Sequence, residues 1–214
     1  SKSGLSQEEK EHRLAVTKGI KADYDLIIEN VDRKKEDDHP ASSPASSIIT
    51  ASLLLDKIVS DLRQVIVKEG KADVLIYGGV RKVSGRPAMP DAHSLVIALL
   101  EDIRQNPESW PPEFTLTPEQ LNVEVIDEDE PALRQAAKGF HRPTFFDFLK
   151  SSFSLKPDML KRYFTQKTVG RTNSYQVKDV VRKFIRITPI ANLAEFTPAK
   201  GRKYDLIIYN FVEY

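Results

Sequence analysis

Short apolar runs, separated by polar turns, divide the chain into strand-like and helix-like segments. Runs rich in β-branched and aromatic residues predict strands near 24–31, 73–83, 121–127 and 204–212. Apolar residues spaced three and four apart predict one long helix from about Ser47 to Lys68 and a second from about Asp91 to Gln105. The pattern favours an α+β fold in which one mixed or antiparallel sheet of about four strands packs against two long helices.

Two of the strand segments have nearly the same sequence. KGIKADYDLIIENV at 18–31 is matched by KGRKYDLIIYNFV at 200–212, and GKADVLIYGGV at 70–80 is a looser copy. Two close copies are too few for a solenoid, so we expect both to be central strands of one sheet. The YDLII string also occurs in adenine methyltransferases, followed there by Asn-Pro-Pro and an aromatic residue. Here ENVD follows it, and no glycine-rich cofactor loop precedes it, which argues against that activity.

The distribution of polar segments predicts a single domain with an N-terminal arm. Residues 1–14 are charged and form the expected arm, and residues 15–214 form the expected α+β domain. Within that domain we expect an acidic half at 15–130, a basic helix-rich half at 131–203 and a closing strand at 204–214. Residues 32–47 (DRKKEDDHPASSPASS) are polar and contain two prolines, so they predict a mobile loop.

The helix-rich half is expected to contain several short helices. Their predicted positions are 131–139, 144–149, 156–167 and 174 to about 187. In the last of these, Lys178, Arg182 and Arg186 form a basic stripe with a spacing of four residues, beside an apolar face. The β-branched residues of this segment make a strand the competing interpretation.

The distribution of charge along the chain says more about possible partners than the overall composition does. The net charge is only +1, but residues 1–130 hold 16 Lys and Arg against 25 Asp and Glu, a balance of −9, and residues 131–214 hold 16 against 6, a balance of +10. Opposite charges on two parts of one chain favour head-to-tail self-association. They equally suit attachment of the basic half to nucleic acid or to an anionic membrane surface.

Basic and aromatic residues alternate between Lys138 and Arg186, and a cationic surface with rings can bind phosphates and stack on bases. Two predicted helices around a glycine-containing turn resemble a helix-turn-helix, although this turn is long for that motif and two simply packed helices are more common. The residues expected to contact an anion or a nucleic acid are Arg142, Lys161, Arg162, Arg171, Lys178, Arg182, Lys183 and Arg186.

Signals for an enzyme or a metal site are weak. The chain has no cysteine, and it lacks the HExxH, P-loop, GxGxxG and GxSxG motifs. Asp37, Asp38 and His39 could ligate a metal, but adjacent side chains in a flexible loop make a poor site. We therefore expect no catalytic residues, no metal and no cofactor, while an enzyme without a recognisable motif stays an alternative. No segment is apolar for long enough to predict a transmembrane helix.

Taken together, these patterns predict a non-enzymatic structural or assembly protein, of a virus particle or an organelle for example. It would self-associate as a homo-oligomer or lattice, or dock its basic half onto an acidic partner. Nucleic-acid binding through the helix at 174–187 is the alternative. The expected location is intracellular (cytoplasmic or nuclear), or inside a virus particle or organelle. The fragment IYGGVRKVSGRP at 76–87 resembles rhabdovirus matrix proteins over a short part of the chain, and this resemblance implies no role for any residue.

Overall fold

A computed structural model describes residues 27–32, 52–83, 86–141, 157–169, 172–192, 196–198 and 201–212. The helices are α2 (Ser52–Glu69), α3 (Pro90–Gln105), α4 (Glu130–Ala136), α6 (Pro157–Tyr163) and α7 (Asp179–Arg182), with a 3-10 turn η3 (Pro107–Ser109). The strands are β1 (Ile27–Asp32), β2 (Ala72–Tyr77), β3 (Arg81–Val83), β4 (Arg86–Ala88), β5 (Leu121–Asp127), β6 (Phe140–His141), β7 (Phe164–Val169), β8 (Thr172–Val177), β9 (Ile185–Pro189) and β10 (Leu206–Val212).

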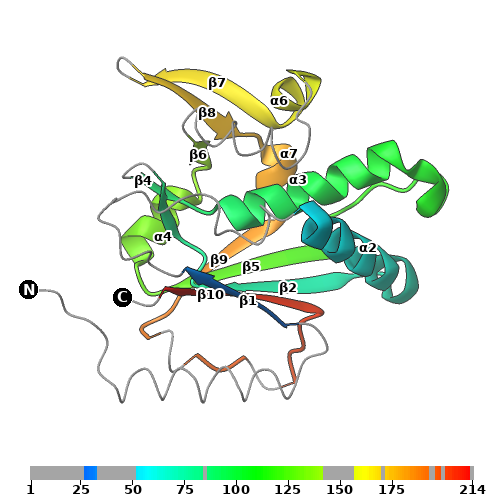
Figure 1. The fold of residues 1–214 in the computed structure, drawn as a ribbon, viewed down its shortest axis with the longest axis horizontal. Helices are drawn as coiled ribbons and strands as arrows, with labels where there is room; N and C mark the ends of the chain where they lie inside the picture. The colour runs from blue at the N-terminus through cyan, green and yellow to red at the C-terminus, as the bar shows by residue number, and fades with distance from the viewer. Residues whose placement is uncertain are drawn as a thin grey trace, which may run out of the picture.

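The largest sheet has five strands in the order β1-β10-β2-β5-β9, and every neighbouring pair is parallel (Figure 1). The four predicted strands all belong to it, so the expected α+β content is confirmed in this coarse form. The prediction of a mixed or antiparallel sheet is wrong. β2, β5 and β10 carry apolar side chains on both faces, a pattern typical of parallel strands that are covered on both sides.

The two nearly identical segments lie side by side. β1 pairs with β10 so that Ile27 is opposite Ile207 and Ile28 is opposite Ile208, which places corresponding residues of the two similar segments side by side. β10 lies between β1 and β2, as expected of a central strand. Among the described strands β1 is at the edge of the sheet, so its predicted central position is wrong.

Two helices cover one face of this sheet. α2 and α3 follow the predicted helices closely, and Figure 1 shows both on the same side of the strands. Ile58 and Leu62 from α2, together with Leu95 and Leu99 from α3, pack against inward side chains such as Val123 from β5. Aliphatic side chains at these positions stabilise the fold by about 1.5–3 kcal/mol each when fully buried.

The segment between β9 and β10 covers the opposite face. Leu75, Tyr77 and Ile126 point to this face because side chains alternate along a strand. Tyr204 joins them in the cluster, and Phe196 packs against the Tyr77 ring with the ring centroids 6.2 Å apart. Both faces of the central strands are therefore buried.

A second sheet lies beyond α3, seen from the parallel sheet (Figure 1). It has three antiparallel strands in the order β6-β8-β7. The predicted helix at 156–167 ends at Tyr163, because residues 164–169 form β7. The predicted helix from 174 to about 187 is wrong: β8, the short α7 and β9 occupy these residues. The helix-rich character expected of the basic half is accordingly not found in the described residues.

The contacts of β9 explain why this segment forms a strand and not the end of the predicted helix. Ile185 and Ile187 pack against the main core, while Arg186 and Thr188, on the opposite face, bind the buried carboxylate of Glu124. This alternation has a period of two, and the tertiary contacts of both faces stabilise the strand. The β-branched residues that made a strand the competing interpretation were the correct signal.

Several smaller predictions can be compared with the structure. The predicted strand at 73–83 ends at Tyr77, and residues 81–83 form β3, which pairs with β4 in a separate two-stranded sheet. The predicted helix at 131–139 exists as α4, and Gly139 has a φ of 73° shortly after it. The arm at 1–14, most of the loop at 32–47 and the helix at 144–149 lie outside the described residues. None of the described helices is both long enough and apolar enough to cross a membrane.

Candidate functional site

The carboxyl ends of the five parallel strands meet at one edge of the sheet. From β2 the chain passes through α3 to β5 and later to β9, whereas β10 lies on the other side of β2. β10, the last described strand along the chain, thus lies between β1 and β2, while α2 and α3 both lie on one face of the sheet (Figure 1). In open parallel sheets, ligands bind outside the carboxyl ends of the strands. We take this edge as the candidate functional site.

Two glycines form the turn that follows β2. Gly78 has a φ of 64°, in the left-handed region that favours glycine. A Cβ atom on Gly79 would lie 2.4 Å from Cγ1 of Val125 and 3.1 Å from Cγ2 of Ile76, which is too close for any side chain. The N–H groups of both glycines point to the carbonyl oxygen of Ile126, at 3.0 and 3.3 Å. The backbone of this turn is thus held tightly against the end of β5.

Asp127, the last residue of β5, lies beside this turn. One carboxylate oxygen accepts a hydrogen bond from the backbone N–H of Val80 at 3.0 Å, and the other accepts one from the N–H of Asp129 at 3.1 Å. Burial raises the pKa of Asp127, and these backbone hydrogen bonds oppose part of the rise. The side chain is only partly buried, and an ionised carboxylate has about four acceptor positions. Asp127 can therefore accept further hydrogen bonds from a ligand.

The carboxylates after Asp127 have structural roles. Asp129 accepts a hydrogen bond from the N–H of Ala132 at 2.9 Å and caps the start of α4. Glu130 forms an exposed ion pair with Arg134 one turn later in the same helix. Within the part of the chain that the structure describes, no group of three or more His, Cys, Asp or Glu side chains is placed to hold a metal ion. The chemistry that Asp127 can offer is hydrogen-bond acceptance, for example from the hydroxyls of a sugar.

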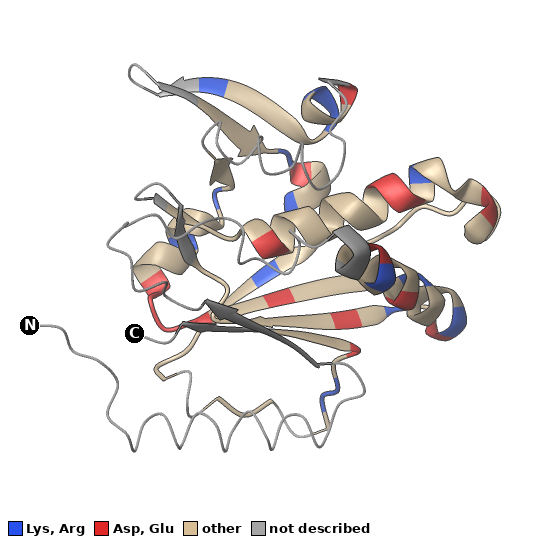
Figure 2. Ribbon diagram, in the orientation of Figure 1, with Lys and Arg blue, Asp and Glu red and all other residues tan. Residues whose placement is uncertain are grey.

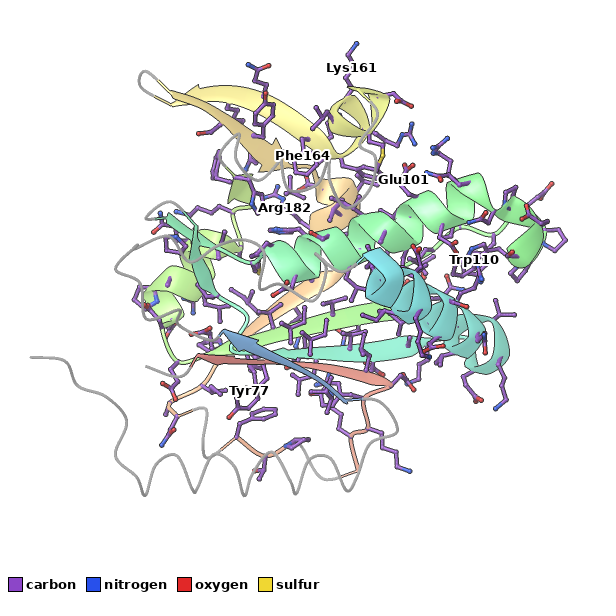
Figure 3. All side chains as sticks on the ribbon, viewed as in Figure 1. Tyr77, Glu101, Trp110, Lys161, Phe164 and Arg182 are labelled. Atoms are coloured by element: carbon purple, nitrogen blue, oxygen red, sulfur yellow. The ribbon has the colours of Figure 1, made fainter. Side chains whose placement is uncertain are left out.

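A groove of about 540 Å³ lies elsewhere, between α2, α3 and α6. Leu55, Val59, Ala98 and Met159 provide its apolar lining. Its charged lining is engaged: Asp102 accepts two hydrogen bonds from Arg63 and others from Asn106 and the Trp110 indole N–H. Figure 3 labels Trp110 at the end of the molecule where α3 ends. These hydrogen bonds of Asp102 join α2, α3 and the following loop. Because the acceptor positions of Asp102 are occupied in this way, the groove offers a ligand few polar groups.

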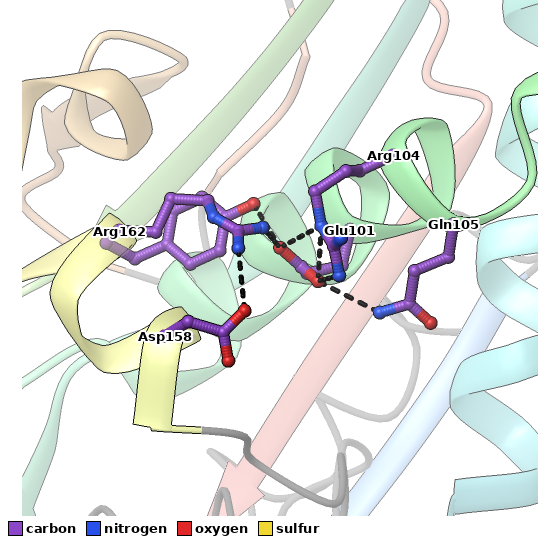
Figure 4. Close-up of polar contacts among 6 residues, drawn as sticks. Glu101, Arg104, Gln105, Asp158 and Arg162 are labelled. Atoms are coloured by element: carbon purple, nitrogen blue, oxygen red, sulfur yellow. Dashed lines mark hydrogen bonds and ion pairs between the residues drawn. The ribbon is translucent and has the colours of Figure 1, made fainter.

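Glu101 is the second carboxylate of this groove and is 4% exposed. Figure 4 shows Arg104, Gln105 and Arg162 around it, and the hydroxyl of Tyr163 donates to the same carboxylate at 2.7 Å. Burial acts to raise the pKa of Glu101, but the hydrogen bonds outweigh it and bring the pKa to about 2. Since Arg162 and Tyr163 belong to α6, this cluster joins α3 to the helix that precedes β7.

The basic residues predicted to bind an anion are spread over several elements (Figure 2). Lys161 and Arg162 lie in α6, Lys178, Arg182 and Lys183 lie in or beside α7, and Arg186 lies in β9. Arg162 forms ion pairs with Glu101 and Asp158, Arg182 with Asp179, and Arg186 with Glu124. Arg142 and Arg171 lie outside the described residues. The structure therefore brings Lys178 and Arg182 close together but places Arg186 in β9, a strand of the parallel sheet.

Glu124 was not singled out by its sequence context, and it is 3% exposed in the middle of β5. Its carboxylate accepts hydrogen bonds from Arg186, Thr188 and Tyr204 at 2.6–2.9 Å and pairs with Arg202 at 2.9 Å. Burial acts to raise the pKa of Glu124, but these donors hold the pKa below its usual value. The signal in the sequence was a lone charge in the alternating run LNVEVID, which predicts either an exposed face or a buried residue with partners.

His93 and His141 are 48 positions apart, and their sequence contexts do not connect them. In the structure Nδ1 of His93 and Nε2 of His141 are 2.9 Å apart, and both rings are buried. No spacing rule within one helix or strand could have joined them, because one lies in α3 and the other in β6.

No model of a known protein family matches the sequence, and no curated protein matches it either.

Proposed function

We propose that this chain is a binding domain for a small ligand that carries a sugar diol, such as a nucleoside-containing cofactor, and that the ligand binds at the carboxyl ends of β2 and β5. The observation that carries the proposal is the all-parallel order β1-β10-β2-β5-β9, which places the Gly78–Gly79 turn after β2 beside Asp127 at the end of β5. This function differs from the absence of a cofactor expected from the sequence.

Two features of the edge support this class of ligand. The two glycines carry no side chain at the carboxyl end of β2, so a ligand can approach the backbone of this turn closely. Asp127 presents a partly buried carboxylate on the neighbouring strand, and its remaining acceptor positions suit two vicinal hydroxyls. Hydrogen bonds to a charged group contribute about 1.5–3 kcal/mol each.

The test is binding of three ligands that share an adenosine group: ATP, NAD and S-adenosylmethionine. Isothermal titration calorimetry on the parent should detect at least one of them. Asp127→Asn should weaken that binding about tenfold or more, because the amide keeps one acceptor oxygen but loses the charge. The melting profile, followed by the fluorescence of buried Trp110, checks that the variant is folded.

Glu69→Gln is the matched control. It also neutralises one carboxylate, but at the end of α2, next to the amino ends of the strands. It should leave the affinity unchanged. The proposal fails if none of the three ligands binds the folded parent, or if Asp127→Asn and Glu69→Gln bind with the parent's affinity.

Self-association is a second candidate function, favoured by the separation of charge along the chain. Lys161 and Lys167, in α6 and β7, are exposed, and so are Glu108, Glu113 and Glu119 in the loop between α3 and β5. These two groups lie on different elements, so the basic surface of one copy can meet the acidic surface of another.

Association of this kind should weaken with salt, because exposed charges are screened beyond about 10 Å at 0.1 M ionic strength. Analytical ultracentrifugation over a series of salt concentrations measures this. The triple variant Glu108→Lys, Glu113→Lys and Glu119→Lys should abolish association. A protein that is monomeric at every salt concentration would rule the candidate out. Nucleic-acid binding stays a prediction without added support, since its arginines lie in ion pairs on separate elements.

A further inference from the structure

The buried histidine pair, His93 and His141, joins the three-stranded sheet to α3, which packs on the parallel sheet. His93 lies in α3, which packs on the parallel sheet, and His141 lies in β6, which pairs with β8 of the three-stranded sheet. The rings meet edge to face with centroids 4.9 Å apart, and the Phe164 ring of β7 lies against His141. Figure 3 shows the labelled Phe164 and Arg182 between α3 and the three-stranded sheet.

The contact requires at least one neutral ring. At 2.9 Å one nitrogen must donate a proton and the other must accept it, so two fully protonated rings would place two N–H donors against each other. A single added proton would place a charge where His93 is 0% and His141 is 4% exposed, and Nε2 of His93 has no hydrogen-bond partner to stabilise it. Protonation therefore opposes the contact at both steps.

The charged groups around the pair add to this cost. Burial, and then the positive charge of Arg182 in α7, lower the pKa of His93 to about 3. Burial and His93 itself keep the pKa of His141 well below its ordinary value. Asp179 is paired with Arg182, and Asp91 of α3 is two residues from His93, a spacing at which helical side chains do not face each other. From β8, Tyr175 lies opposite His141 in the strand register.

We propose that the histidine pair is an acid-sensitive contact that holds the three-stranded sheet on α3, and that mildly acidic conditions release this sheet while the parallel sheet stays folded. The direction of the pH effect follows from the pKa values of the histidines before and after release. In the closed state the three-stranded sheet is held on α3, and in the open state it is released. A released histidine regains a pKa near 6.5, so in mild acid the open state binds protons that the closed state does not bind. The closed state is fully favoured above about pH 6.5, and the open-to-closed ratio rises about tenfold per histidine for each pH unit below it.

Other described contacts between these units do not titrate in this range: Phe164 and Val177 pack in the apolar core that contains Leu95 and Leu99 of α3. Glu101 binds Arg162 and Tyr163 two turns further along α3, and its pKa of about 2 keeps it ionised through the range in which the histidines titrate. The pKa of Glu124 within the parallel sheet is also lowered. Release at mildly acidic pH should therefore depend on the histidines rather than on these carboxylates.

Hydrogen exchange read by mass spectrometry tests the proposal on the full chain at about pH 7 and about pH 5, with exchange times corrected for the intrinsic pH dependence. Peptides covering β6, β7 and β8 should lose protection about tenfold or more at the lower pH, and peptides covering β2 and β5 should keep it. The double variant His93→Gln and His141→Gln replaces the pair by two amides that hydrogen bond without titrating, and it should lose the selective response. His39→Gln, which removes a histidine outside the pair, should respond like the parent.

Two results would overturn the proposal: equal protection of β6–β8 at both pH values in the parent, or a loss that persists in the folded double variant. If the double variant does not fold, His141→Gln alone must halve the slope of the logarithm of protection against pH, since one of two titrating groups is gone. An unchanged slope would equally exclude the pair as the cause.

Discussion

The parallel sheet and the three-stranded sheet are held in the molecule by different kinds of contact. In β2 and β5 no described side chain is exposed, and helices or strand connections cover both faces. In β7 the side chains of Thr165, Gln166 and Lys167 are exposed, and the described core residues of β7 and β8 are Phe164 and Val177. The larger sheet rests on apolar burial, whereas the smaller one depends on a few rings and on polar contacts with α3.

Stability is therefore concentrated in the parallel sheet. Apolar burial supports the parallel sheet along its whole width, so its strands should open only when the whole domain unfolds. The three-stranded sheet is joined to α3 through the histidine pair and through Tyr163 and Arg162 on Glu101. Few contacts of this kind allow a unit to open by itself, at a lower free energy than global unfolding.

Removing β10 should break the larger sheet and has the largest expected effect. Deleting residues 204–214 leaves β1 without its described partner and exposes the edge of β2. Leu206, Ile207 and Ile208 are at most 1% exposed, so their loss removes contacts on both faces of the sheet at once. We expect the truncated chain to show no cooperative thermal transition by circular dichroism. A truncated protein that still melts at the parent temperature would place β10 outside the core.

The sequence predicted the strands of the larger sheet because apolar runs dominate them. VLIY in β2, VEVI in β5 and LII in β10 are strand-like without any tertiary information. Strand direction was not predictable in the same way. The sequence pattern predicted a mixed or antiparallel sheet, because the covering of both faces depends on α2, α3 and the segment before β10.

The three-stranded sheet escaped prediction because its strands are polar. TNSYQV in β8 alternates weakly, and FTQKTV in β7 follows a helix without a glycine or proline between them. Basic residues four apart at 178, 182 and 186 imitated one helix face, although the structure places them in three different local structures. The candidate site was missed for a related reason. Gly78 and Gly79 follow β2 and Asp127 ends β5, and only the order of the strands in the sheet brings them together.

Removing a single hydroxyl group should weaken the contact between α3 and the three-stranded sheet by a smaller amount. Tyr163→Phe removes the hydrogen bond from Tyr163 to the buried carboxylate of Glu101 and leaves the ring in the core. Because Arg104, Gln105 and Arg162 still donate to Glu101, we expect a loss of only about 1–2 kcal/mol. Hydrogen exchange should show the loss in β7 and β8, with β2 and β5 unchanged. Thr165→Ala, at an exposed position two residues along, is the matched control and should change nothing.

The same variant also changes the response to strong acid. The low pKa of Glu101 means that the folded state holds fewer protons than the unfolded state, so this carboxylate stabilises the fold above about pH 4.5 and loses that contribution as the pH falls toward 2. Losing the Tyr163 donor moves the pKa of Glu101 up toward its ordinary value. Tyr163→Phe should therefore differ most from the parent near neutral pH and converge with it in strong acid. Denaturant titrations across this range measure the difference. A difference that stays constant down to about pH 2 would mean that the hydroxyl contributes through packing and not through the charge of Glu101.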